Sequence, residues 1–182
     1  FDILGAKAYG MWSGPEDRRV SMEVFNFSRV ILLREEMRAR GDAKPVWAVE
    51  MGWNALPRDW RGAPSPWGSD AEETQSDRLQ RGIARARGEW SWMPALFVQH
   101  FQPDAPADDP IWGFALLDQN FQPRMAYSAL KNAIAAPVVP ATFDFTRFYF
   151  GIGLLAVAGA VAVWRAAKYF PSLVWRDAWR AA

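Results

Sequence analysis

Cysteine is absent from this chain of 182 residues, and histidine occurs once, as His100. Without cysteine there are no disulfide bonds and no thiolate metal sites, and one histidine leaves no histidine-based metal site. Neither sign of charge is in excess, because 21 lysines and arginines stand against 20 acidic residues. A nucleic-acid-binding surface is therefore not implied. We expect no cofactor, no metal and no nucleic-acid partner.

Tryptophan, in contrast, is abundant, with 11 residues. Two common causes of such enrichment are platforms that stack on carbohydrate and belts at a membrane interface. The sequence leaves both causes open for this chain.

Apolar strand-like segments alternate with amphipathic helical patterns over the first three quarters of the chain. The predicted strands are Phe1–Tyr9, Pro45–Glu50 and Ala95–Phe101, and the predicted helices cover about 28–40, 70–87 and 124–135. This alternation predicts an α/β fold in which the three strands are parallel neighbours joined by right-handed crossovers.

Local signals predict how two of these helices begin and pack. Ser28 is the predicted N-cap of the first helix, whose buried stripe includes Val30, Leu33 and Met37 at helical spacing. The second helix is expected to begin at the capping box Ser69-Asp70-Ala71-Glu72.

The segment Lys44–Trp53, with the sequence KPVWAVEMGW, combines a short apolar run with the carboxylate of Glu50 at its end. A run of this kind is typical of a strand buried on both faces of a parallel sheet. In (β/α) barrels the carboxyl ends of the strands carry the chemistry, which makes Glu50 a candidate catalytic residue. The alternative is that Glu50 faces solvent or pairs with an arginine.

This segment resembles the seventh-strand motif of retaining glycoside hydrolases of the large (β/α)8 clan, of the cellulase, β-mannanase and β-xylosidase type. The resemblance continues in segments that are similar to the sixth strand, the eighth strand and the closing part of such barrels, namely residues 1–10, 95–101, 112–118 and 123–127. It implies that residues 1–135 form the C-terminal portion of a TIM (β/α)8 barrel, with about three βα units.

The resemblance also implies roles for individual residues. Glu50 matches the nucleophile, and Tyr9 matches a tyrosine that commonly donates a hydrogen bond to it, although Tyr9 as an aromatic packed at the rim is an alternative. Trp53 is the predicted sugar platform, whereas Trp60 and Trp67 of the following loop are interpreted as anchors of that loop. His100 and Trp12 complete the predicted substrate-binding set, and a packed rim residue is the alternative for His100.

Two departures from the clan's pattern bear on activity. Lys7 stands where the clan usually has a histidine. The acid/base of the clan comes from an Asn-Glu pair on the fourth strand, and no segment of this sequence matches that strand. We therefore expect the chain to be the C-terminal part of a longer protein and to be inert by itself.

Beyond the barrel-like part, the composition changes. Residues 136–146 are a proline-containing linker, and the run from Phe148 to Trp164 carries no charge. This run predicts a single transmembrane helix over 147–170, with a buried core helix as the alternative. The basic tail, 171–182, is expected to be cytoplasmic or interfacial, which places the barrel portion outside the cytoplasm.

Two functions follow from these expectations. The first is a membrane-anchored, extracytoplasmic glycoside hydrolase-like domain that contacts carbohydrate and lipid. The second is a non-catalytic accessory or structural subunit of a larger membrane complex, whose helix packs on partner helices through small residues such as Ala156 and Ala160. The partners are accordingly carbohydrate, membrane lipid, and either partner helices or the missing N-terminal part of the same protein.

Overall fold

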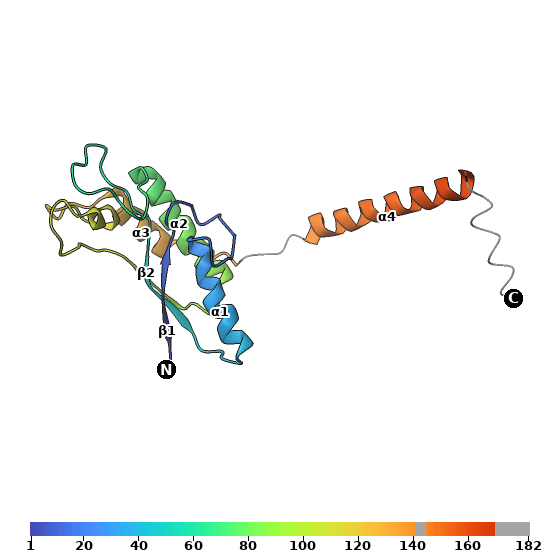
Figure 1. Ribbon diagram of the computed structural model, residues 1–182, viewed down its shortest axis with the longest axis horizontal. Helices are drawn as coiled ribbons and strands as arrows, with labels where there is room; N and C mark the ends of the chain where they lie inside the picture. The colour runs from blue at the N-terminus through green and yellow to red at the C-terminus, as the bar shows by residue number, and fades with distance from the viewer. Residues whose placement is uncertain (141–144, 170–182) are drawn as a thin grey trace. The chain divides into compact units, whose positions relative to one another are not determined.

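The structure, a computed structural model, describes residues 1–140 and 145–169; in the second range, side chains are described for residues 153–166 and 168. The chain divides into two units, Phe1–Ala141 and Thr142–Ala182. Figure 1 shows the N-terminal unit as a sheet with helices packed beside it, and the C-terminal unit as one long helix.

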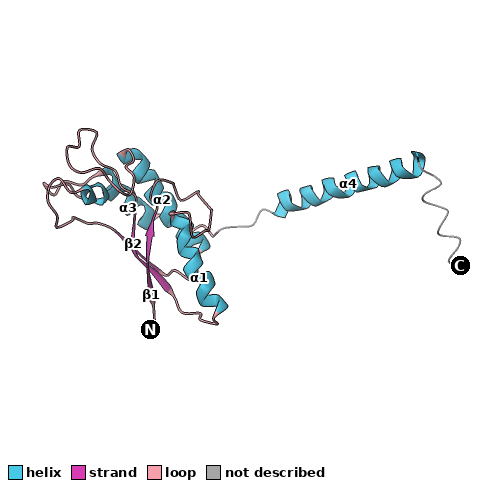
Figure 2. Ribbon diagram, viewed as in Figure 1, coloured by secondary structure: helices cyan, strands magenta, loops and turns pink. Residues whose placement is uncertain are grey.

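The N-terminal unit is built on a three-stranded parallel sheet in the order β1-β2-β3. Figure 2 shows strands of this sheet in magenta. The strands are β1 (Leu4–Tyr9), β2 (Val46–Gly52) and β3 (Ala95–Val98). The predicted parallel arrangement is therefore confirmed. The strand β3 ends earlier than predicted, because the backbone of His100 pairs instead with Phe114 and Leu116.

Each strand is followed by a helix, as the sequence predicts for βα units. The helices are α1 (Val30–Ala39), which continues from the short 3-10 helix η1 (Phe27–Arg29), α2 (Glu72–Glu89) and α3 (Met125–Ala135). A second 3-10 helix, η2 (Pro110–Phe114), lies between β3 and α3. The sheet and helices match a portion of a (β/α) barrel.

The core lies between one face of the sheet and the helices. Ala6, Val46, Ala48 and Met51 are buried on this face, and they pack with helix residues that include Val30, Met37, Leu79, Ile83 and Ala86. The other face is open within the described residues: Val49 is 42% exposed and Phe97 is 50% exposed. The prediction that β2 is buried on both faces is therefore wrong for the described part of the chain.

Among the described residues, Trp53 is the largest fully buried side chain, and it joins the sheet to α2. Its indole N–H donates to Ser13 O over 2.7 Å, and its ring lies 5.4 Å from the ring of Phe27. Two glycines make room for it: a Cβ at Gly82 would lie 2.7 Å from Trp53 Cη2, and one at Gly10 would lie 1.7 Å from Nε1. The helix α2 therefore needs glycine at position 82 to approach the sheet.

The predicted helix caps are wrong. Ser28 is buried inside η1, where it donates to Asp17 O and accepts from Arg85, so it does not cap α1. The helix α2 begins at Glu72, and its N-cap position is Ala71, which has no side-chain oxygen to cap with. Ser69, the predicted cap, accepts a hydrogen bond from the backbone N–H of Leu56 instead.

The buried stripe of α1 is only partly as predicted. Val30 and Met37 are buried, whereas Leu33 is 44% exposed because nothing in the described residues covers its side of the helix.

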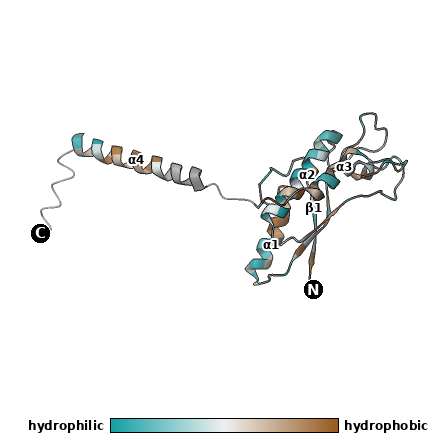
Figure 3. Ribbon diagram, turned by 180° about the vertical axis from the view of Figure 1, so that it is seen from behind, coloured by the Kyte–Doolittle hydropathy of each residue, from teal (hydrophilic) through white to brown (hydrophobic). Residues whose placement is uncertain are grey.

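The C-terminal unit contains α4 (Phe145–Tyr169), close to the helix predicted over 147–170. Its large apolar side chains from Leu154 to Trp164 are exposed. Figure 3 colours parts of this helix as hydrophobic. Among the residues that the structure describes, no helix has both the length and the apolar character needed to cross a bilayer. The predicted tail 171–182, and residues 141–144 of the predicted linker, lie outside the described residues.

Candidate active site

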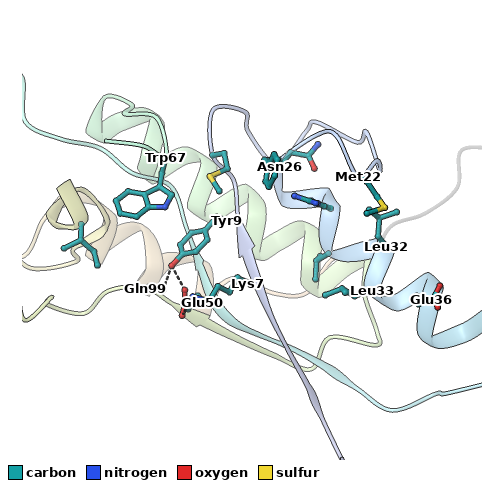
Figure 4. Close-up of a pocket in the computed structure, with 15 residues that line it drawn as sticks. Lys7, Tyr9, Met22, Asn26, Leu32, Leu33, Glu36, Glu50, Trp67 and Gln99 are labelled. Carbon is teal, nitrogen blue, oxygen red and sulfur yellow. Dashed lines mark hydrogen bonds and ion pairs between the residues drawn. The ribbon is translucent and has the colours of Figure 1, made fainter. Parts of the chain in front are cut away.

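Polar side chains from all three strand ends meet at the carboxyl edge of the sheet. Lys7 and Tyr9 come from β1, Glu50 comes from β2, and Gln99 directly follows β3. Parallel strands place their carboxyl ends at one edge, which is where (β/α) barrels carry their chemistry. Figure 4 shows these four side chains converging around the hydroxyl of Tyr9 and the carboxylate of Glu50.

Both oxygens of the Glu50 carboxylate have a hydrogen-bond donor. The Tyr9 hydroxyl donates to Oε2 over 2.6 Å, and Lys7 Nζ lies 3.0 Å from Oε1. The register of the sheet explains the second contact, because Lys7 and Glu50 are paired positions on β1 and β2. The predicted contact of Tyr9 with Glu50 is thus present, and the carboxylate is held from two sides.

The surroundings of Glu50 favour its ionised form. Partial burial raises the pKa of Glu50, but the hydrogen bonds from Tyr9 and Lys7, with the charges of Lys7 and His100, outweigh it and hold the pKa below its ordinary value. At neutral pH the group is therefore a carboxylate. An anion can attack an electrophilic carbon or accept a proton, and it cannot serve as a general acid.

Tyr9 stays protonated over the whole range in which Glu50 titrates. Burial raises the pKa of the Tyr9 hydroxyl, and the hydrogen bond to the Glu50 carboxylate and its charge raise it further. The ring is fixed by Phe114, with ring centroids 5.3 Å apart. Tyr9 consequently acts as a fixed donor to Glu50.

Gln99 extends this network to His100, and the sequence reasoning missed it. The hydroxyl oxygen of Tyr9 lies 2.5 Å from Gln99 Oε1, and the amide nitrogen of Gln99 contacts His100 Nε2. Burial lowers the pKa of His100, and the charge of Glu50 partly opposes this. The signal in the sequence is that Gln99 is a polar residue at the end of an apolar strand-like segment, as Glu50 is.

A cavity of about 960 Å³ opens over these residues. Lys7, Tyr9, Glu50 and Gln99 form its polar end (Figure 4). The wall beside α1 is mostly apolar and includes Met22, Phe25, Val30, Leu32 and Leu33. Trp67 from the loop after β2 and Ile111 from η2 also line the cavity. The space is within the range of small-molecule sites, which is typically about 300–1,000 Å³.

The tryptophans do not lie as predicted. Trp53 is 1% exposed and points into the core, so it has no free face to offer a sugar ring, and its prediction as a platform is wrong. Trp12 is exposed, but it packs against Gly68 and is not among the residues that line the cavity. Trp67 lines the cavity and packs edge-on against Phe114, although it was interpreted only as a loop anchor.

A second carboxylate in the described lining of the cavity is Glu36, on α1. It is paired with Arg40, with 2.6 Å between Glu36 Oε1 and Arg40 Nε, and is exposed. Within the described ranges, no group of three or more histidine or acidic side chains is arranged to hold a metal ion.

No family model matches the sequence, and no curated protein matches it. The solved structures that it resembles include glycoside hydrolases. A β-glucuronidase of Bifidobacterium dentium is 19% identical, with 76% of this chain and 21% of that chain covered and a TM-score of 0.46.

Two further solved structures give similar values. A GH2 β-galacturonidase from Eisenbergiella tayi is 16% identical over 75% of this chain and 24% of that chain, with a TM-score of 0.49. A family 39 glycoside hydrolase from Bacteroides cellulosilyticus is 18% identical over 72% of this chain and 26% of that chain, also with a TM-score of 0.49. The chain thus spans between a fifth and about a quarter of these chains. A likeness of this degree carries no conclusion about activity.

Proposed function

We propose that Glu50 is the nucleophile of a retaining glycoside hydrolase and that a carbohydrate binds in the cavity above it. The observation that carries the proposal is the geometry of Glu50. Its carboxylate lies at the carboxyl end of a parallel strand, is held through both oxygens by Tyr9 and Lys7, and opens onto a cavity of about 960 Å³. The resemblance of residues 44–53 to a nucleophile motif supports the same role.

In this mechanism a carboxylate oxygen of Glu50 attacks the anomeric carbon, and the bond from that carbon to the leaving oxygen breaks. The leaving oxygen takes a proton from a general acid. Water, deprotonated by the same group, then displaces Glu50 and releases the sugar with retained configuration. The hydrogen bond from Tyr9 and the charge of Lys7 also stabilise Glu50 as a leaving group in the second step, since they favour its anionic form.

The general acid must come from a second carboxyl group about 5–5.5 Å from the first. Glu36 is a poor candidate, because it lies on α1 and is exposed and paired with Arg40. We therefore propose that further polypeptide, adjoining the open side of the sheet, supplies this group. The chain by itself would then hydrolyse no glycoside.

The test is a pair of variants in the chain assembled with the polypeptide that supplies the second carboxyl group. Glu50→Gln should lower kcat on an aryl glycoside by several orders of magnitude while the protein stays folded, because a neutral amide cannot form the glycosyl ester. Glu73→Gln, on the exposed face of α2, is the matched control and should keep the activity. Undiminished turnover in Glu50→Gln would remove Glu50 from the mechanism.

We also propose that the C-terminal helix anchors the chain in a membrane, with the N-terminal unit outside the cytoplasm. The support is in the sequence, where the uncharged run from Phe148 to Trp164 is followed by Arg165 and Lys168. The chain should then stay with membranes in an alkaline carbonate wash, and protease added to intact cells should cleave the N-terminal unit. Release of the chain by carbonate would overturn the anchor.

A non-catalytic accessory subunit is the second candidate function. The identity of Lys7 favours it, because this lysine stands where the clan that the sequence resembles usually has a histidine. In that case Glu50→Gln would leave the function of the assembly unchanged.

A further inference from the structure

The Tyr9 hydroxyl has one proton and lies within hydrogen-bond distance of two oxygens. These are Glu50 Oε2 at 2.6 Å and Gln99 Oε1 at 2.5 Å. One proton can be donated to only one of them. With the amide oriented this way, either Glu50 or Gln99 faces an oxygen lone pair of Tyr9 at close range.

The orientation of a glutamine amide is assigned from its hydrogen bonds, because its oxygen and nitrogen have nearly the same size. Turning the Gln99 amide by half a turn brings Nε2 to the Tyr9 oxygen and Oε1 to His100 Nε2. Gln99 can then donate to Tyr9, and it accepts from His100 when that ring carries its proton on Nε2. Each donor in the network then faces an acceptor.

We infer that Gln99 is a positioning residue, which donates to the Tyr9 hydroxyl and thereby directs the single Tyr9 proton to Glu50. The proton order is His100 Nε2–H to Gln99 Oε1, Gln99 Nε2–H to Tyr9 Oη, and Tyr9 O–H to Glu50 Oε2. Lys7 pairs with the other oxygen of the Glu50 carboxylate, Oε1. The inference concerns the same site as the proposed function and rests on it only for the catalytic role of Glu50.

The charged and titratable groups around this network belong to few residues. Glu50 is the charge that acts on His100, and Lys7, Tyr9 and His100 act on Glu50. Neutral His100 suffices as the terminal donor if its proton is on Nε2. The arrangement therefore needs no imidazolium.

The test is a titration of Glu50 by carbon NMR in the 182-residue chain labelled at the glutamate carboxyl carbons. The Glu50 signal is assigned by its loss in Glu50→Gln. Gln99→Met keeps the length of the side chain and removes the amide, so Tyr9 loses the donor that orients it. The pKa of Glu50 should then rise, because the hydrogen bond from Tyr9 that lowers this pKa is weakened. Tyr9→Phe should also raise the pKa of Glu50, and by at least as much, because it removes that hydrogen bond altogether.

A double-mutant cycle separates positioning from a general effect on structure. Because Gln99 acts through Tyr9, Gln99→Met should add no further shift in a Tyr9→Phe background. Gln80→Met, at an exposed glutamine of α2, is the matched control and should leave the Glu50 titration unchanged. Gln99→Asn, which keeps the amide and shortens its reach, should reproduce the upward shift if Gln99→Met does not fold.

An unchanged Glu50 titration in Gln99→Met, or an equal shift with and without the Tyr9 hydroxyl, would overturn the inference. These outcomes are independent of glycoside hydrolysis. A failed titration test therefore leaves the proposed role of Glu50 standing, and a catalytically silent Glu50 leaves the positioning by Gln99 standing.

Discussion

Lys7 and Glu50 are register partners on adjacent parallel strands, and their side chains form an ion pair with 3.0 Å between Nζ and Oε1. The ammonium group balances the charge of the candidate nucleophile at the position where the clan that the sequence resembles usually has a histidine. Lys7 thus supplies Glu50 with both a hydrogen bond and a nearby positive charge.

The effect of this ion pair on Glu50 can be measured directly. We expect Lys7→Met to raise the pKa of Glu50, because the variant removes both a hydrogen bond to the carboxylate and a nearby positive charge. The carbon NMR titration of the Glu50 carboxyl measures it, with Lys131→Met on α3 as the matched control. A titration of Glu50 that does not move in Lys7→Met would show that the two side chains do not interact in solution.

Stability should depend on pH through Glu50. A carboxyl whose pKa is lowered by folding stabilises the protein above its ordinary pKa, 4.5 for Glu50, and loses this contribution as the pH falls through the folded-state value. The free energy of unfolding of the wild type, relative to that of Glu50→Gln, should therefore decrease as the pH falls from about 7 to about 3. Urea denaturation at a series of pH values measures it.

The same series in a Tyr9→Phe background is the control, because this change removes one of the two donors. The pH-dependent difference should become smaller there. A difference that is constant with pH, or that grows as the pH falls, would contradict the ionised and hydrogen-bonded state of Glu50.

Trp53 should matter for stability. Trp53→Ala removes a fully buried indole that packs on Phe27 and donates to Ser13 O, so we expect it to lower the free energy of unfolding by about 3–5 kcal/mol. Trp12→Ala, at a tryptophan that is 65% exposed, should cost less than about 1 kcal/mol. Chemical denaturation of both variants tests the prediction. Equal costs would contradict the assignment of Trp53 to the core.

Arg124 joins the loop after β2 to the closing segment of the N-terminal unit. Its guanidinium is buried, pairs with Glu72 at 2.7 Å, and donates to the carbonyls of Ala55 and Trp112. Arg124→Met leaves Glu72 and these carbonyls without their donor, so we expect a loss of about 3–5 kcal/mol of stability.

Arg124→Lys should not restore the stability, since an ammonium group cannot reproduce the forked contacts of a guanidinium. Arg58→Lys, in the exposed part of the same loop, is the control. If Arg124→Lys were as stable as the wild type in urea denaturation, the multiple hydrogen bonds of the guanidinium group would not be required.

Most of the fold of the N-terminal unit could be predicted from the sequence. Alternating strand and helix patterns fix the order of the elements, and right-handed crossovers then make consecutive strands parallel neighbours. The predicted helix starts lie within about two residues of the observed ones, but the capping residues could not be predicted, because they depend on tertiary contacts. Ser28 bonds to Asp17 and Arg85, which lie far from it in the sequence.

The site was predicted only in part. The contact of Tyr9 with Glu50 follows from the two strand ends. The pairing of Lys7 with Glu50 depends on a register shift between β1 and β2, where β2 has the extra residue Val49, and no local pattern indicates this shift. The direction of an indole ring is likewise decided by tertiary packing. For this reason Trp53, next to the strand end, lies in the core, and Trp67, from a distant part of the loop, lines the cavity.

The most direct test of the role of Glu50 is covalent trapping. A 2-deoxy-2-fluoro glycoside with a good leaving group slows the second step of a retaining mechanism, so the glycosyl ester accumulates. The chain, assembled with the polypeptide that supplies the second carboxyl group, is incubated with this reagent, digested and analysed by mass spectrometry. We predict a fluoroglycosyl adduct on Glu50 that is absent in Glu50→Gln; turnover of the parent glycoside with the adduct on another carboxylate would contradict the assignment.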